Sequence, residues 1–182
     1  MLSRESLAAR LSSGASASFL FFWGHTPKQV GVVDGACLSQ WFRCSFVVDG
    51  TTYATAEHFM MAEKARLFGD RNALAAILAA GTPSDAKALG RTVRGYDEPA
   101  WERARSEAVV RGNLGKFGQN PGLRTFLLGT APHVLVEASP RDRIWGIGMG
   151  ARNPDAREPT RWRGRNLLGF ALMETRDRLV QP

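Results

Sequence analysis

The sequence predicts an α+β fold, predominantly helical, in a single domain with a small β element. Its 182 residues are enough for one domain with a sizeable core and too few for two. The middle third, residues 72–129, consists of Ala- and Leu-rich or amphipathic segments separated by glycine and proline, a pattern typical of helices. Short β-prone segments lie before and after this helical body, so few and short strands are expected.

The N-terminal segment, residues 1–18, is predicted to be a flexible or weakly helical tail. It contains Arg4 and Arg10 among serines and alanines, but Glu5 interrupts it and no adequate apolar core precedes a cleavage site. A frayed tail or a short helix fits this composition better than a targeting peptide. The domain is therefore expected to span residues 19–182.

A short strand and a hairpin are predicted before the first long helix. Residues 19–23 form an aromatic run typical of a strand. Asp49-Gly50 separates two further β-prone runs, residues 43–48 and 51–53, and this is the best short hairpin signal in the chain. Such a hairpin would deliver the chain directly into the next element.

Residues 55–68 are predicted to form the helix around which the chain is organised. Thr55 can serve as its N-cap, and Glu57 falls in the first turn, where the helix dipole favours a negative charge. At ~100° per residue, Glu57 and Lys64 both lie within the apolar stripe, ~10 Å apart along the axis. Buried charges are costly unless they have partners or face a cleft. The two residues could hold a small molecule between them, or each could pair with another charge in the fold.

The helical body is predicted to contain four helices and one intervening segment. Three arginines in this body, Arg103, Arg105 and Arg111, are expected to form a solvated face rather than a site. The expected helices are residues 72–80, a helix capped at residues 82–85, residues 101–114 and residues 123–128, with residues 116–119 between the last two.

The C-terminal third is predicted to contain a strand, a glycine-rich loop and a last helix. Residues 133–138 form the strand, and the helix at 167–179 has core-facing Leu168 and Leu172, with Leu179 at its end. Residues 162–166, at the N-terminus of that helix, could bind an anion.

The glycine-rich loop contains Gly146, Gly148 and Gly150, spaced two apart beside Trp145. Glycines at this spacing would let the backbone approach a ligand closely. The loop is not a dinucleotide-binding fingerprint, because G-x-G-x-x-G is absent and no βαβ unit surrounds it.

Composition limits the class of protein and its partners. Lys and Arg outnumber Asp and Glu by 24 to 17, which favours anionic partners, and no segment approaches the ~18 apolar residues that cross a membrane. Cys37 and Cys44 match neither a redox motif nor a zinc knuckle, so both are expected to be buried in a reducing, cytoplasmic compartment. His25, His58 and His133 are scattered in sequence, and no metal is predicted.

Several separate motifs, in order from about residue 19 to residue 179, resemble the NADAR family, also called the YbiA-like group, whose name refers to NAD and ADP-ribose. One block, Ser39-Gln40-Trp41, departs from the Ser-Asn-Phe of many members. The matching motifs are Thr55-Ala56-Glu57-His58-Phe59 with Lys64, Leu89-Gly90-Arg91, Lys116-Phe117, Val136-Glu137-Ala138-Ser139-Pro140, Asp142-x-x-Trp145-Gly146-Ile147-Gly148 and Gly164-x-Asn166-Leu167-Leu168-Gly169.

The resemblance implies a YbiA-like fold and an enzyme that hydrolyses N-glycosidic bonds; no cofactor is expected. Some members of the family remove ADP-ribose from guanine bases, in certain bacteria as antitoxin to a DNA-modifying ADP-ribosyltransferase. Others are linked to cleavage of phosphoribosylamino-pyrimidine intermediates of riboflavin synthesis. The implied partners are thus ADP-ribosylated nucleic acid or a phosphoribosyl small molecule, together with a cognate ADP-ribosyltransferase toxin in the first case.

Three residues are candidates for the chemistry of a C1–N bond cleavage. Glu57 could stabilise the positive charge that develops on the ribose, or activate water. Lys64, on an apolar face, could form a Schiff base with the opened sugar if it is neutral, or bind phosphate or a ribose hydroxyl if it stays charged. Asp142 could hydrogen-bond the ribose or the leaving base.

The remaining candidates are expected to bind substrate. Trp145 could stack on the base, or could be a core residue. Asn166 could hold phosphate or cap the last helix. The full set of predicted substrate-binding residues is Ser39, Gln40, Trp41, His58, Arg91, Trp145, Gly146, Gly148, Arg165 and Asn166.

Two other classes of function compete with the enzyme. The chain could be a non-enzymatic module that binds ADP-ribose or modified nucleic acid, or Glu57 and Lys64 could only stabilise the fold. The sequence does not choose the substrate, and it leaves the oligomeric state and any paired toxin open.

Overall fold

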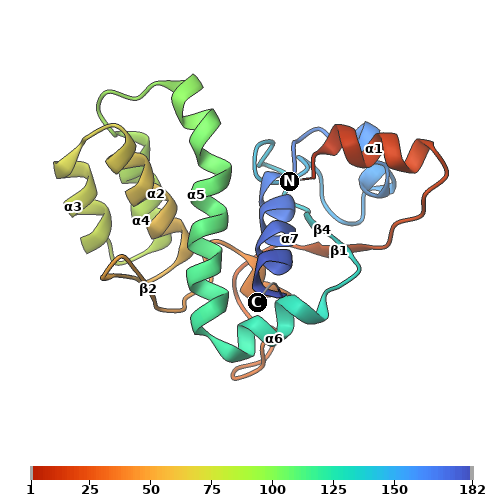
Figure 1. Ribbon diagram of the computed structural model, residues 1–182, viewed down its shortest axis with the longest axis horizontal. Helices are drawn as coiled ribbons and strands as arrows, with labels where there is room; N and C mark the ends of the chain where they lie inside the picture. Colours follow the sequence, from red (N-terminus) through yellow and green to blue (C-terminus); the bar gives the residue numbers. More distant parts are fainter. Residues whose placement is uncertain (1, 181–182) are drawn as a thin grey trace. The chain divides into compact units, whose positions relative to one another are not determined.

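Side-chain caps define most of the helix starts in the computed structural model, which describes residues 2–180 (Figure 1). Thr55, Asp70, Thr82 and Asp97 each accept a hydrogen bond from a backbone N–H in the first turn of the helix that follows. The helices are α1 Arg4–Ser12, α2 Ala56–Leu67, α3 Arg71–Ala79, α4 Pro83–Arg91, α5 Glu98–Gln119, α6 Pro121–Gly129 and α7 Leu167–Val180.

The strands are short, as predicted, and they form two separate two-stranded sheets within the described residues. β1 Phe19–Phe22 pairs in parallel with β4 Val134–Glu137, and β2 Phe46–Val48 pairs antiparallel with β3 Thr51–Tyr53. The fold is therefore α+β and predominantly helical, which confirms the predicted class.

The chain forms two compact units. The first unit combines the chain up to Ser39 with the chain from Gly122 onward, and the second unit is Gln40–Pro121. The domain spanning residues 19–182 stays a prediction, and each unit is described by itself below.

In the second unit, the hairpin leads directly into α2. Asp49 and Gly50 both have positive φ, 49° and 72°, as a two-residue turn of the primed type requires, and the predicted hairpin is confirmed. α2 then packs against α3, α4 and α5 (Figure 1). The second unit is thus built around the helix that the sequence singled out.

α5 is longer than predicted, and the separate segment at residues 116–119 is wrong. The helix continues through Gly115, where a Cβ atom would lie 2.9 Å from side-chain carbons of both Phe46 and Val48. At Gly112 a Cβ would lie 2.6 Å from a ring carbon of Phe59. These glycines sit inside a helix because α5 packs closely against β2 and α2, where a side chain would clash.

The expected solvated arginine face on α5 is also wrong in part. Arg105 is only 4% exposed and its guanidinium lies 2.6 Å from the Glu102 carboxylate. Arg111 is half-buried and pairs with Asp49 and, at 2.9 Å, with Glu63. The partners of Arg111 lie in the hairpin turn and on α2, contacts that the helix period alone did not show.

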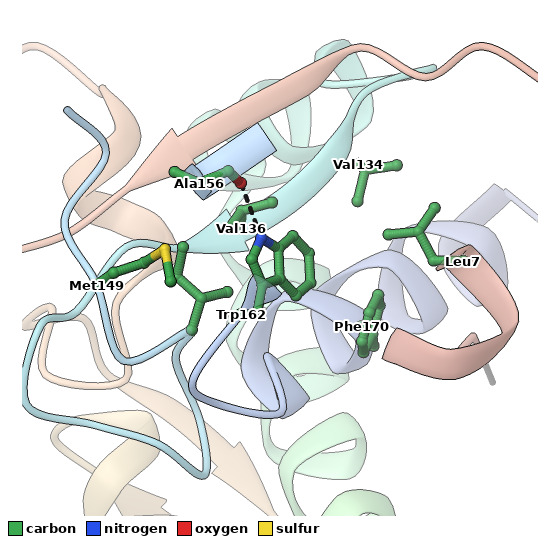
Figure 2. Close-up of a cluster of buried hydrophobic side chains, with 8 residues drawn as sticks. Leu7, Val134, Val136, Met149, Ala156, Trp162 and Phe170 are labelled. Atoms are coloured by element: carbon green, nitrogen blue, oxygen red, sulfur yellow. Dashed lines mark hydrogen bonds between the residues drawn. The ribbon is translucent and has the colours of Figure 1, made fainter. Parts of the chain in front are cut away.

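The first unit has a core between the β1/β4 pair, α7 and the loops after β4 (Figure 2). Trp162 lies in its centre, and its indole N–H donates to the Ala156 carbonyl oxygen over 2.8 Å, so the one polar atom of the ring is satisfied. The buried members of this cluster are Leu7, Val134, Val136, Ile147, Met149, Ala156, Trp162 and Phe170.

Part of the N-terminal segment belongs to this core. α1 starts with a capping box between Ser3 and Ser6, and its Leu7 is 3% exposed. In the last helix Leu168 and Leu172 are buried as predicted, whereas Leu179 is half-buried. Among residues 2–180, none of the helices is both long and apolar enough to cross a membrane.

Candidate functional site

Glu57 occupies a buried position in the first turn of α2. Glu57 is only 2% exposed to solvent. Its backbone N–H donates to the Gln40 carbonyl oxygen over 3.0 Å. Thr55 fixes the start of the helix by accepting from the His58 N–H. The positive end of the helix dipole favours a carboxylate at this point. The structure thus supplies a buried acid on a rigid element.

A buried amide pair fixes the neighbourhood of Glu57. The side-chain amide of Asn113, in α5, donates to the side-chain oxygen of Gln40 over 2.9 Å and to the Val109 carbonyl oxygen over 2.8 Å. Because Gln40 Oε1 accepts this bond, Gln40 presents its Nε2 as a donor. Neither Gln40 Nε2 nor Asn113 Oδ1 has a hydrogen-bond partner among the described residues. The pair therefore retains one donor and one acceptor beside the segment that holds Glu57.

Asn113 was missed by the sequence interpretation. The sequence does contain a signal that could have revealed it. Asn113 is a polar residue on α5 whose apolar neighbours Val109, Val110 and Phe117 are all 0% exposed. Such a residue needs a specific partner. The period of the helix predicts that the position is buried, but the partner, Gln40, lies far away in sequence and only packing brings it there.

Lys64 is half-buried and has two contacts in the second unit. Its Nζ donates to the Gly90 carbonyl oxygen over 2.8 Å and lies 4.1 Å from the centroid of the Tyr96 ring. Burial lowers the pKa of the Lys64 amine, because desolvation disfavours the charged form. The amine therefore loses its proton more readily than that of a lysine in water. The Gly90 carbonyl oxygen and the Tyr96 ring hold the amine in position.

Lys116, in the NADAR-like Lys116-Phe117 motif, is fully buried. Its Nζ lies 5.0 Å from the centroid of the Phe117 ring and 5.7 Å from that of Phe42. Its positive charge also acts on Cys44, whose thiol pKa is nevertheless raised, because desolvation is the larger effect. Cys37 is buried as predicted, but Cys44 is only half-buried.

Of the other predicted binding residues, His58 is engaged within the second unit. Its Nδ1 lies 2.8 Å from the Thr55 hydroxyl and its Nε2 lies 3.0 Å from the Ala80 carbonyl oxygen. Desolvation lowers the pKa of His58, and the Ala80 hydrogen bond opposes this in part. Both ring nitrogens already have partners, so in this structure His58 joins α2 to the end of α3.

The remaining candidates at this end of the sequence are more accessible. Trp41 is half-buried, with the Lys87 ammonium 5.8 Å from the centroid of its ring. Arg91 is exposed at the end of α4. Ser39 is half-buried and belongs to the first unit, directly after the 3-10 helix η1 Gly35–Leu38. Their roles as substrate ligands stay predictions.

In the first unit, Asp142 shapes the predicted glycine-rich loop. Its Oδ1 accepts from the backbone N–H groups of Ile144 and Trp145, over 2.8 and 2.7 Å. Its carbonyl oxygen accepts from the Gly148 N–H over 3.0 Å. Asp142 therefore closes the turn that presents Trp145, which is half-buried. A catalytic role for Asp142 stays a prediction.

The glycines of this loop are packed against protein backbone. A Cβ atom at Gly146 would lie 2.8 Å from the Glu137 carbonyl oxygen, and one at Gly164 would lie 2.3 Å from the Gly146 carbonyl oxygen. Gly148 has φ 68°, which disfavours other residues. The spaced glycines were expected to let a ligand approach the backbone. In the structure, Gly146 lets a neighbouring segment of the chain approach it closely.

Asn166 connects the loop to β4. Its side chain accepts from the Glu137 N–H and donates to the Leu135 carbonyl oxygen, each over 2.9 Å, and the residue is 0% exposed. The Asn166 carbonyl oxygen accepts from the Phe170 N–H at the start of α7, but the Asn166 side chain makes no hydrogen bond to α7, because its two polar atoms bond β4. Arg165, one residue earlier, is exposed.

The structure thus gathers ten of the thirteen predicted residues into two groups, one in each unit. Glu57, His58 and Lys64 share α2, and Gln40 contacts its first turn. The second group comprises Asp142, Trp145, Gly146, Gly148, Arg165 and Asn166, which lie in the connected loops of the first unit. No group of three or more His, Cys, Asp and Glu side chains suited to a metal ion occurs within residues 2–180.

A buried acid at a helix start, a half-buried lysine seven residues later and a loop braced by Asp142 and Asn166 occur here in a helical α+β fold. These features define the class of the protein: residues 21–180 match the NADAR domain, and the chain belongs to the NADAR family. Known members can then be compared directly with this chain.

The chain is 40% identical over 164 residues to an N-glycosidase of Acanthamoeba polyphaga mimivirus, covering 87% of this chain and 95% of the relative. It is 33% identical over 133 residues to N-glycosidase YbiA of Escherichia coli, covering 73% and 74% of the two chains. The NMR structure of E. coli YbiA superposes with a TM-score of 0.70 at 28% identity, over 91% of this chain and 86% of that one.

Proposed function

We propose that this protein is an N-glycosidase that hydrolyses a ribose C1–N bond, and that its substrate is ADP-ribose attached to guanine in nucleic acid. Relatives named N-glycosidases support the reaction class. The excess of 24 Lys and Arg over 17 Asp and Glu supports a polyanionic substrate. The choice of ADP-ribosylated guanine as substrate goes beyond the reaction class that these relatives support.

The observation that carries the proposal is the environment of Glu57. Breaking the C1–N bond creates an oxocarbenium-like ribose, which a carboxylate close to C1 stabilises. Glu57 is 2% exposed in the first turn of a helix whose start is held by Thr55 and by the Gln40 carbonyl oxygen. Such an acid is held in place before the reaction, and little reorganisation is required when charge develops.

Lys64 is proposed to act on the same ribose as a nucleophile. Its lowered pKa makes the neutral amine accessible, and only the neutral amine attacks C1. Attack forms a C–N bond from Lys64 to C1 as the base leaves with its electron pair and takes a proton from water. Ring opening gives the Schiff base, and water then hydrolyses it and returns the free lysine.

The test is product analysis with an oligonucleotide ADP-ribosylated on guanine. The wild-type protein is expected to release free ADP-ribose and leave unmodified guanine, both measured by mass spectrometry. Glu57→Gln is expected to reduce turnover by about 10²–10⁴-fold with little change in ligand affinity, because the amide is isosteric but carries no charge.

Glu63→Gln is the matched control, because it makes the same change on the same helix at a half-buried residue that pairs with Arg66 and Arg111. It should retain turnover. Retained turnover in Glu57→Gln would contradict the role of Glu57, and a wild-type protein that binds the oligonucleotide without cleaving it would be the binding module instead. If the protein cleaves only a phosphoribosylamino-pyrimidine, the proposed N-glycosidase reaction stands and the proposed guanine substrate is wrong.

A further inference from the structure

In the second unit, the side chain of Lys64 reaches the end of a neighbouring helix. Its Nζ donates to the carbonyl oxygen of Gly90, near the C-terminus of α4, over 2.8 Å. The last four carbonyl groups of a helix have no partner within the helix, and they form its negative end. The ammonium group of Lys64 therefore satisfies a backbone acceptor at a point where the helix favours positive charge.

Gly90 allows this contact because it has no side chain. A Cβ atom at this position would overlap the Met61 Sδ and lie 2.8 Å from the Met61 Cγ. Met61 lies three residues before Lys64 on α2. α4 therefore approaches α2 closely just where the amine meets the carbonyl oxygen.

The ring of Tyr96 is the second contact of the amine. Nζ of Lys64 lies 4.1 Å from the ring centroid, within the ~6 Å over which a ring face attracts a cation. The ring of Phe68 meets that of Tyr96 edge to face, with 5.4 Å between the centroids and 70° between the planes. Phe68 is the C-cap of α2, so the helix that carries Lys64 also orients the ring.

The backbone on both sides of Tyr96 is held by side-chain carboxylates. Before it, the Arg94 N–H donates to the Asp70 carboxylate over 2.9 Å. After it, Asp97 caps α5 by accepting a backbone N–H of the first turn over 2.7 Å. Tyr96 is 46% exposed, so burial alone does not place it. The fixed backbone keeps its ring over the amine.

No charged side chain within residues 2–180 contributes to the pKa of Lys64, which burial lowers. On its own helix, Glu63 pairs with Arg66 and Arg111. The helices packed against α2 also carry charged residues that do not contribute: Arg71 in α3, Asp85, Lys87 and Arg91 in α4, and Glu98, Glu102, Arg103, Arg105, Glu107 and Lys116 in α5. The two contacts of the amine described above, a carbonyl oxygen and a ring face, are both uncharged.

The Tyr96 hydroxyl keeps its proton at neutral pH. Burial raises the pKa of this hydroxyl, and nearby carboxylates, that of Glu98 first, raise it further against the opposing effect of Arg105. The ring therefore acts on Lys64 through its π face, not as a phenolate that would pair with the ammonium group.

We propose that Tyr96 is a positioning residue for Lys64: its ring face, together with the Gly90 carbonyl oxygen, holds the ammonium form in place and thereby sets the pH above which Lys64 carries a free amine. A ring face and a helix C-terminus favour the ammonium form, whereas burial favours the free amine. Of these opposing effects, the ring is the one that a substitution can vary at nearly constant shape.

The contact does not depend on the proposed function, but its consequence for turnover rests on Lys64 being the nucleophile of that function. Only the free amine attacks, so the ring determines how much of the enzyme is ready to react at a given pH. An enzyme whose ring attracts the ammonium group less strongly should stay active to lower pH.

The experiment titrates Lys64 by NMR of the lysine side chains, which is practical because the chain has four lysines, Lys28, Lys64, Lys87 and Lys116. It compares Tyr96→Phe with Tyr96→3,4,5-trifluorophenylalanine, because fluorine withdraws electrons from the ring face and weakens its attraction for a cation. The acid dissociation constant of Lys64 should be about two- to fivefold larger with the fluorinated ring, the range expected for a cation–π contact near the surface.

Two controls accompany this titration. Lys87 lies 5.8 Å from the centroid of the Trp41 ring and should titrate identically in both variants. Tyr53→Phe changes the other tyrosine of the chain, in the same unit, and should leave the titration of Lys64 unchanged. Equal dissociation constants of Lys64 with the Phe and the trifluorophenylalanine ring would overturn the proposal. An equally large change at Lys87 would also overturn it, because the effect would not then come from the ring.

The pH dependence of turnover separates this proposal from the proposed function. With an oligonucleotide ADP-ribosylated on guanine, the fluorinated variant should keep its kcat/KM to lower pH than Tyr96→Phe. If Lys64 titrates as expected but the wild-type protein does not cleave, the contact stands and the proposed function fails. If the wild-type protein cleaves and the two variants share one dissociation constant, the function stands and the role of Tyr96 fails. If the constants differ but the pH profiles of kcat/KM coincide, Tyr96 does not control turnover and its positioning role is overturned.

Discussion

The two groups of predicted site residues use their side chains in opposite ways. On α2 in the second unit, Glu57 and Lys64 project from a regular helix whose backbone needs neither of them to form its hydrogen bonds. In the first unit, Asp142 and Asn166 use side-chain atoms to bond backbone groups of the loop and of β4. The residues proposed to react thus project from a helix that does not depend on their side chains, while the side chains in the first unit hold the backbone of their own loops in place.

This difference predicts which property, turnover or stability, a substitution in each group should change. A substitution on α2 removes a reactive group and leaves the backbone in place, so turnover should respond more than stability. A substitution in the loops of the first unit removes backbone support, so stability and ligand affinity should respond together. Any variant that gives the opposite pattern would break this distinction between the two groups.

The largest effect is expected for Lys64→Met. Removing the amine should reduce turnover by about 10²–10⁴-fold, while the apolar side chain still fills the half-buried position. Lys64→Arg should be equally inactive if Lys64 is a nucleophile, because a guanidinium stays protonated. Single-turnover assays measure both, and borohydride reduction of the wild-type reaction should trap a covalent sugar adduct on Lys64.

Lys87→Met is the control for this prediction, since Lys87 also lies beside an aromatic ring in the second unit. Full activity in Lys64→Arg, with no trapped adduct, would make Lys64 a phosphate or hydroxyl ligand rather than a nucleophile. Full activity in Lys64→Met would remove it from the site.

A smaller but purely structural effect is expected for Gly164→Ala. The new Cβ would lie 2.3 Å from the Gly146 carbonyl oxygen and 2.8 Å from the Arg143 Cα, both backbone atoms that cannot rotate away. The free energy of unfolding should fall by about 3 kcal/mol, as measured by urea denaturation. Gly150→Ala, whose Cβ would meet nothing closer than 3.8 Å, should have almost no effect. Equal stability of the two variants would show that the loop tolerates a shift.

The smallest effect concerns the pH dependence of stability through His58. Its pKa is lowered in the folded state, so below the unfolded value of about 6.5 the unfolded chain binds the proton more readily. Stability is therefore full above pH 6.5 and declines as the pH falls toward the folded pKa, by at most about 1.4 kcal/mol for each pH unit. His58→Gln should flatten this decline in denaturation curves between pH 7 and 5.

The exposed His25 supplies the control, as His25→Gln should leave the decline intact. A decline of the same size in His58→Gln would assign the pH dependence to other groups. Turnover at pH 7 is the accompanying measurement, because a His58 that only joins α2 to the end of α3 should affect it little.

Local signals predicted the frame of the molecule well. Thr55 as a cap, Asp49-Gly50 as a hairpin turn and Thr82-Pro83 at a helix start each act through bonds and dihedral angles within a few residues, and each is confirmed. The same reasoning failed at Gly115, because the reason for a glycine there is the distant β2 strand. Local rules do not contain such a contact.

The sequence by itself determined the helical α+β class, the position of Glu57 and Lys64 on one helix and the membership in the NADAR family. Only the tertiary structure decided that Asn113 holds Gln40 and that Asn166 bonds β4. The physical reason is the range of the interactions. Caps, turns and helix periods join neighbours in the chain, whereas buried polar groups find partners among residues that packing alone brings together.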